Sequence, residues 1–143
     1  MSDTFTGLEL RSAAREDGTL VLNLEETTLT APGEGEIVVR VEAAPINPSD
    51  LGLLLGPADV STLETSGDAD RPIVTFQVPR ERQGGVRARL GQSLPVGNEG
   101  AGTVVAAGAG AEGLQGKRVG MMGGAMYAQF RKLKARDVVP LPE

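Results

Sequence analysis

Glycine is the residue that most restricts how this chain can fold. Twenty of the 143 residues are glycine and nine are proline, and both are spread along the sequence. Such frequent interruptions disfavour long helices and are typical of short strands joined by tight turns. Aromatic residues make up only 3% of the chain, so aliphatic side chains must fill the core. The sequence therefore predicts one mainly β domain with a single buried core.

Alternating side chains indicate where the strands lie. Residues 20–24 carry leucine at every second position. In residues 36–42 the aliphatic side chains of Ile37, Val39 and Val41 share one face, and the charged ones of Glu36, Arg40 and Glu42 share the other. This period of two predicts antiparallel strands with one face buried. After Gly97 the chain returns to the same kind of pattern. Strands are expected there at residues 100–108, 118–122, 125–130 and 138–142.

The segment 44–50 interrupts the strands with two prolines, which push the preceding residues toward extended geometry. Ser49 or Asp50 is expected to cap a short leucine-rich helix that runs to Leu55. Two interpretations of Asn47-Pro48-Ser49-Asp50 stay open. It is a turn with a helix cap, or a loop that presents an amide and a carboxylate to a cleft.

Residues 57–95 show the least regular pattern in the chain. Their first part is polar and predicts a loop with one helical turn at most. A short helix is expected over residues 80–90, weakened by Gly84-Gly85 at about 1 kcal/mol per glycine. We interpret the whole segment as an irregular insertion between barrel strands.

The composition excludes several classes of function. The chain contains no cysteine and no histidine, so it has no disulfide, no thiolate or imidazole metal ligand, and no Cys or His catalysis. The net charge of −5 argues against nucleic-acid binding. The only cationic stretch alternates with apolar residues and predicts a solvated strand face: Arg131, Lys132, Lys134 and Arg136. No apolar run could span a bilayer and the N-terminus is polar, so a cytoplasmic location is expected.

Residues 108–113 match the dinucleotide-binding fingerprint G-x-G-x-x-G. The fingerprint requires a helix directly behind it, whose N-terminal amides meet the pyrophosphate. Here residues 114–119 lead straight into another expected strand. We therefore interpret the segment as a glycine-rich turn.

Four segments together resemble the N-terminal, GroES-like domain of the medium-chain dehydrogenase/reductase superfamily, most closely its quinone oxidoreductase and enoyl reductase branches. They occur in the family's order and spacing over nearly the whole chain outside 57–95. The segments are residues 39–50, 95–105, 110–120 and 124–130. The resemblance implies a partly open antiparallel GroES-like β-barrel with a few short helices.

The resemblance also implies a site without zinc. Zinc-dependent members carry a cysteine at the position of Asn47 and a histidine at the position of Asn98, and both are amides here. The family's structural-zinc loop is missing too. Asn47 and Asp50 would then orient the reacting groups without a metal. The remaining residues expected to line the cleft are Ile46, Ser49, Asn98, Glu99 and Tyr127, although a single tyrosine is usually only a wall residue.

The implied activity is hydride transfer from NADPH or NADH to a quinone or an α,β-unsaturated carbonyl. Enoyl reductases of this type carry a tyrosine shortly after the loop at Asn47–Asp50. Residues 56–58 contain none, which disfavours enoyl-CoA as the substrate. The cofactor would be held mainly by a following Rossmann domain, which is absent from residues 1–143, so the fragment alone is expected to be inactive. A homodimer stays open, and neither a nucleic acid nor a membrane is expected as a partner. The alternative is a free-standing GroES-like barrel that acts as a non-catalytic binding or assembly module.

Overall fold

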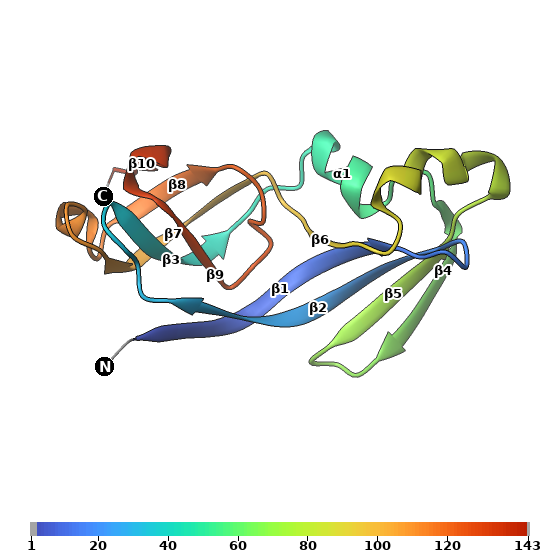
Figure 1. Cartoon of the computed structure of the whole chain (residues 1–143), viewed down its shortest axis with the longest axis horizontal. Coiled ribbons are helices and arrows are strands. Elements are labelled where there is room, and N and C mark those ends of the chain that lie inside the picture. The colour runs from blue at the N-terminus through green and yellow to red at the C-terminus, as the bar shows by residue number, and fades with distance from the viewer. Residues whose placement is uncertain (1–2, 143) are drawn as a thin grey trace. The chain divides into compact units, whose positions relative to one another are not determined.

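The strands of this chain form two five-stranded antiparallel sheets in a computed structural model that describes residues 3–142 (Figure 1). Met1, Ser2 and Glu143 lie outside the described range. The sheet orders are β4-β5-β2-β1-β6 and β10-β8-β7-β3-β9, and 52% of the residues are in strands. The expected mainly β, GroES-like fold class is confirmed.

The elements follow one another along the chain in this order. They are β1 (Thr4–Ala14), β2 (Thr19–Thr30), β3 (Glu36–Ala43), α1 (Pro48–Leu54), β4 (Asp59–Gly67), β5 (Pro72–Gln77), the 3₁₀ helix η1 (Arg80–Arg89), β6 (Ser93–Pro95), β7 (Glu99–Ala107), the 3₁₀ helix η2 (Glu112–Leu114), β8 (Arg118–Met122), β9 (Phe130–Lys134), the 3₁₀ helix η3 (Ala135–Asp137) and β10 (Val138–Pro140).

The described chain divides into two compact units, and each has its own hydrophobic cluster. Unit 1 comprises residues 3–9, 26–45 and 97–142, and unit 2 comprises residues 10–25 and 46–96. The expectation of a single core is therefore wrong. The segment 57–95 brings apolar side chains of its own, and these pack against β1 and β2 of unit 2. That second cluster consists of Ala14, Leu20, Ala58, Phe76, Val78 and Val86.

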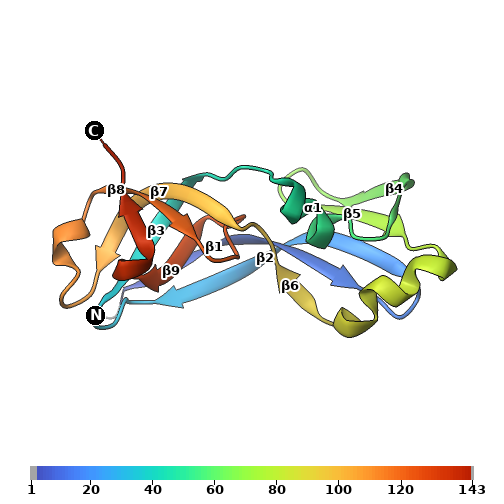
Figure 2. The same cartoon turned by 90° about the horizontal axis from the view of Figure 1, so that it is seen from above.

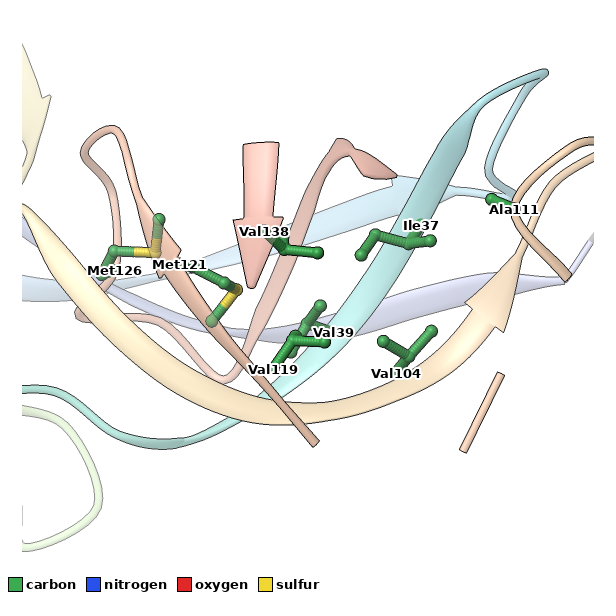
Figure 3. Packing of buried hydrophobic residues seen from close by; sticks show 8 residues of the cluster. All are labelled: Ile37, Val39, Val104, Ala111, Val119, Met121, Met126 and Val138. Atoms are coloured by element: carbon green, nitrogen blue, oxygen red, sulfur yellow. The ribbon is translucent and has the colours of Figure 1, made fainter. Parts of the chain in front are cut away.

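The core of unit 1 is built around β3, which pairs with β7 on one side and β9 on the other. Ile37, Val38 and Val39 are all fully buried, although alternation predicted only Ile37 and Val39 to be so. The eight side chains of the cluster come from β3, β7, β8, β10 and two loops. In Figure 3, Ala111 lies at the opposite end of the cluster from Met121 and Met126.

The expected irregular insertion at residues 57–95 is wrong at the level of secondary structure. The segment forms β4, β5, η1 and β6, and Figure 2 shows η1 as the coil between β5 and β6. β4 is an edge strand that pairs only with β5 in its sheet, and most of its residues are exposed. Without a buried face the strand has no apolar alternation, so the sequence looked like a loop. The expected short helix near residues 80–90 is confirmed as η1.

Two further boundaries also differ from expectation. The helix α1 begins at Pro48, with Asn47 as its N-cap residue in place of Ser49 or Asp50. The strand expected at 125–130 is instead a loop followed by β9, because Gly123, Gly124 and Ala125 all have positive φ. Three such residues in succession cannot continue a strand. In the cationic stretch, Arg131 is half-buried and donates hydrogen bonds to backbone carbonyls, so that face is only partly solvated.

Glu36 closes the turn before β3 and provides a pH-dependent contribution to stability. Its carboxylate accepts a hydrogen bond from the Gly33 N–H at 3.0 Å and pairs with Lys134 at 3.0 Å. These partners, the Gly33 amide first, hold the pKa of Glu36 below its usual 4.5. A depressed folded-state pKa gives stability that is present above pH 4.5 and lost as the pH falls through the folded-state value.

We therefore expect Glu36→Gln to flatten the loss of stability in acid. Urea unfolding of both proteins at several pH values between about 6 and about 3 measures the difference. The free energy of unfolding of the wild type should fall more steeply with acidification than that of the variant. Parallel pH profiles for the two proteins would contradict this role for Glu36.

Candidate functional site

The start of α1 holds two of the predicted site residues in direct contact. Asn47 has extended backbone angles, φ −89° and ψ 156°, which are typical of an N-cap. Its N–H donates to Oδ2 of Asp50 at 2.8 Å. Asp50 is 2% exposed and lies on the same helix face as buried Leu54, four residues later. The carboxylate of Asp50 thus fixes the Asn47 backbone and reaches almost no solvent in this chain.

The residues around this cap leave large apolar side chains open to solvent. Asn47 is half-buried and Ser49 is exposed. Ile46 is 72% exposed and Leu51 is 43% exposed, which is high for large aliphatic side chains. Unit 2 therefore presents an amide and a hydroxyl beside exposed hydrocarbon along a stretch of six residues.

Tyr127 of unit 1 contacts two separate segments of its own unit, at Pro45 and at Gly97. Its hydroxyl donates to the carbonyl oxygen of Pro45 at 2.8 Å. Gly97 has φ +96°, and a Cβ there would lie 2.6 Å from Cδ1 of the Tyr127 ring. The N–H of Met126 also donates to the Gly97 carbonyl at 3.1 Å. Tyr127 therefore stands against the residues that precede Ile46 and Asn98 in the chain.

Asn98 and Glu99 follow at the start of β7. Asn98 is exposed, and its carbonyl accepts a hydrogen bond from Gly123 at 3.0 Å. Glu99 is half-buried and, like Pro45, lines a pocket of about 400 Å³ in unit 1. The remaining lining residues are Ala43, Gly100, Ala101, Gly120, Met121, Met122, Asp137 and Val139.

Sequence reasoning missed the apolar part of this pocket. Met122 is 69% exposed and Val139 is 67% exposed, although both belong to strands. The signal was present in the sequence, because Met122 ends one strand and Val139 lies within another.

The structure brings the predicted residues together as two groups. In unit 2, Asn47 is hydrogen-bonded to Asp50, with Ile46 directly before Asn47 and Ser49 directly before Asp50 in the chain. In unit 1, Tyr127 is hydrogen-bonded to Pro45, and Glu99 lines the same pocket as Pro45.

The G-x-G-x-x-G segment does not have the structure that a dinucleotide requires. Residues 108–111 form a turn, and the following helix η2 is a 3₁₀ helix of three residues. A Cβ on Gly108 would overlap the carbonyl oxygen of Gly33, so this glycine serves a close approach between backbones. The prediction of a glycine-rich turn is confirmed.

Two kinds of feature are missing from the described residues, a group of metal ligands and a membrane-spanning helix. Among residues 3–142, no three His, Cys, Asp or Glu side chains are grouped so that they could hold a metal ion. No helix in that range is long and apolar enough to cross a membrane.

Comparison with known proteins gives the family. A solved structure from Bacillus thuringiensis, described as a putative NADPH:quinone reductase, is 25% identical with a TM-score of 0.62, and the match covers 97% of this chain and 34% of that one. A probable oxidoreductase from Mycobacterium abscessus shares the fold, with 20% identity and a TM-score of 0.55 over 96% of this chain and 35% of that one. The chain thus spans about a third of the length of these relatives.

No functionally curated protein matches it. Residues 33–143 match the sequence profile of the alcohol dehydrogenase GroES-like domain. The chain belongs to this GroES-like domain family of medium-chain oxidoreductases.

Proposed function

We propose that this chain is the substrate-side domain of a zinc-independent, NAD(P)H-dependent oxidoreductase that transfers hydride to a quinone or an α,β-unsaturated carbonyl. The observation that carries the proposal is the match to the GroES-like domain profile over residues 33–143. The 25% identity to the Bacillus thuringiensis protein, over 97% of this chain, favours the quinone reductase branch. We expect the whole protein to work in the cytoplasm.

The donor set does not fit the catalytic zinc of the family's metal-dependent members. Zinc in such sites is bound by thiolate and imidazole, and the chain has neither cysteine nor histidine. Asn47 and Asn98 offer amides at the positions where those ligands are expected. The carboxylate of Asp50 is buried against the Asn47 backbone. No step of the proposed reaction therefore involves a metal.

Without a metal, the substrate oxygen must be polarised by hydrogen-bond donors. The half-buried amide of Asn47 and the exposed hydroxyl of Ser49 are donors of the required kind. Exposed Ile46 and Leu51 suit the hydrocarbon of a quinone or an enone. Asp50 contributes by fixing Asn47 and is a positioning residue in this proposal.

The cofactor supplies the hydride when it is bound, but this chain does not hold it alone. The only G-x-G-x-x-G segment of the described chain is a turn, and the 3₁₀ helix that follows it has only three residues. The apolar pocket of unit 1, with exposed Met122 and Val139, is the kind of surface that another domain covers. We propose that a dinucleotide-binding domain of the longer protein docks on this face.

The exposed face also bears on the alternative of a free-standing binding module. A module that functions by itself should cover this face or bury it in a symmetric oligomer. Among the described residues, Met122 and Val139 keep about two thirds of their surface exposed. A stable oligomer of the 143-residue chain in sedimentation velocity would favour the module, and a monomer would favour the docking domain.

The activity test compares two proteins from the same gene. We expect the product of the complete reading frame to oxidise NADPH with 1,4-benzoquinone or 2-cyclohexenone, at a rate that a zinc chelator leaves unchanged. We expect no measurable rate from the purified 143-residue chain, because residues 3–142 contain no functional dinucleotide fingerprint. NADPH oxidation by the short chain, or a complete reading frame without a βαβ unit, would contradict the proposal.

A further inference from the structure

One carbonyl in the last turn of α1, that of Leu53, is held by two side chains from distant parts of unit 2. The hydroxyl of Ser12, on β1, donates to the carbonyl oxygen of Leu53 at 2.8 Å. Nη1 of Arg89, at the end of η1, donates to the same oxygen at 3.1 Å and to the Ser12 hydroxyl at 3.2 Å. Ser12 is fully buried. We call Ser12, Leu53 and Arg89 the α1 clamp.

In the α1 clamp, a single charged nitrogen of Arg89 makes two hydrogen bonds. Burial lowers the pKa of the Arg89 guanidinium, yet arginine stays protonated at neutral pH. Its positive charge faces the C-terminal end of α1, where the helix carbonyls carry partial negative charge. The other terminal nitrogen of Arg89 is buried without a hydrogen-bond partner among the described residues. It lies beside Gly56, where a Cβ would be 3.1 Å away.

A helix as short as α1 depends on such contacts. It has seven residues, and helices of this length are not stable on their own in water. At the other end of α1, Asp50 fixes the Asn47 backbone. A shift of the C-terminal end along or around the helix axis would therefore move Asn47 as well.

We propose that Arg89, supported by Ser12, is a positioning residue that sets where α1 presents Asn47. This gives a role to the segment 57–95, which supplies η1 and Arg89. The importance of Asn47 for catalysis rests on the proposed function, whereas its placement by the α1 clamp does not. The two statements can be tested separately.

The first experiment measures placement in the 143-residue chain, with Arg89→Met, Arg89→Lys and the control Arg87→Met. Arg87 is exposed on the same 3₁₀ helix. We expect Arg89→Met to speed hydrogen exchange about tenfold at the Leu55 and Gly56 amides, which donate to the Leu51 carbonyl. The side-chain NH₂ resonances of Asn47 should shift, and the β2–β5 amides should keep their protection. Arg89→Lys should restore part of both effects, and Arg87→Met should show neither.

Two results of the first experiment would overturn the proposal. Unchanged exchange at Leu55 and Gly56 would show that Arg89 does not hold α1. Equally faster exchange throughout unit 2 would show that Arg89 contributes only to overall stability. The variant Ser12→Ala, which removes one donor and leaves Arg89 in place, should reproduce the local effect at smaller size.

The second experiment measures catalysis in the protein from the complete reading frame. We expect Arg89→Met to lower kcat about tenfold or more while KM changes less, since small misplacements of a catalytic group cost rate. Local exchange without a change in kcat would overturn the link to catalysis. If the wild-type protein reduces no quinone or enone, the proposed function fails, and the exchange and resonance data still decide whether Arg89 places Asn47.

Discussion

Replacing Gly102 by alanine is expected to destabilise unit 1 strongly. Gly102 lies on β7 opposite Val41 of β3, next to an irregularity in the pairing between Val41 and Ala43. A Cβ at this position would overlap the carbonyl oxygen of Arg40 and lie 2.8 Å from its carbonyl carbon and 2.9 Å from the Val41 Cα. All of these are backbone atoms, so no side-chain rotation can relieve the overlap. We expect a loss of about 3 kcal/mol or more in the free energy of unfolding, beyond the usual cost of an overpacked core.

Urea unfolding followed by far-UV circular dichroism measures this loss. Gly113→Ala is the matched control, because a Cβ there meets nothing within 4 Å and its φ is not in the left-handed region. That variant should stay within about 0.5 kcal/mol of the wild type. A Gly102→Ala protein as stable as the Gly113→Ala control would show that β3 and β7 do not approach as closely as described.

Where local chemistry decides the structure, the sequence was sufficient. The strand expected at 100–108 is β7, displaced by one residue to Glu99–Ala107. The strand expected at 118–122 is β8 with the same bounds. The segment 108–113 could be identified as a turn because the residues between it and β8 are too few for the helix that a dinucleotide fingerprint requires. Each of these conclusions depends on neighbours within a few residues.

The features that the sequence did not predict depend on contacts between residues far apart in the chain. β4 is a strand because β5 pairs with it, while its own polar sequence indicates a loop. The α1 clamp joins residues 12, 53 and 89, and no spacing in the sequence connects them. For the candidate site, residue type suggested Asn47 and Asp50, but the near-complete burial of Asp50 depends on how α1 packs within unit 2. Residue type indicates which chemistry is available, and packing decides which atoms can perform it.

The burial of Asp50 leads to the second large expected effect. If Asp50 acts by fixing the Asn47 backbone, the group it must provide is an acceptor at Oδ2, 2.8 Å from the Asn47 N–H. Asparagine keeps a carbonyl oxygen of similar shape in that place, whereas alanine removes it. We therefore expect Asp50→Ala to cost about 1–2 kcal/mol of stability and Asp50→Asn clearly less.

The same pair of variants separates positioning from acid–base chemistry in the protein from the complete reading frame. For positioning, Asp50→Ala should lower kcat/KM for quinone reduction about 100-fold, because the start of α1 shifts, and Asp50→Asn should keep most of the activity. For a proton-transfer role, Asp50→Asn should be as damaging as Asp50→Ala, because an amide cannot exchange a proton in this way. Steady-state rates for both variants, measured beside their unfolding curves, distinguish the two. Since the carboxylate is only 2% exposed and already bonded to Asn47, we expect the positioning result.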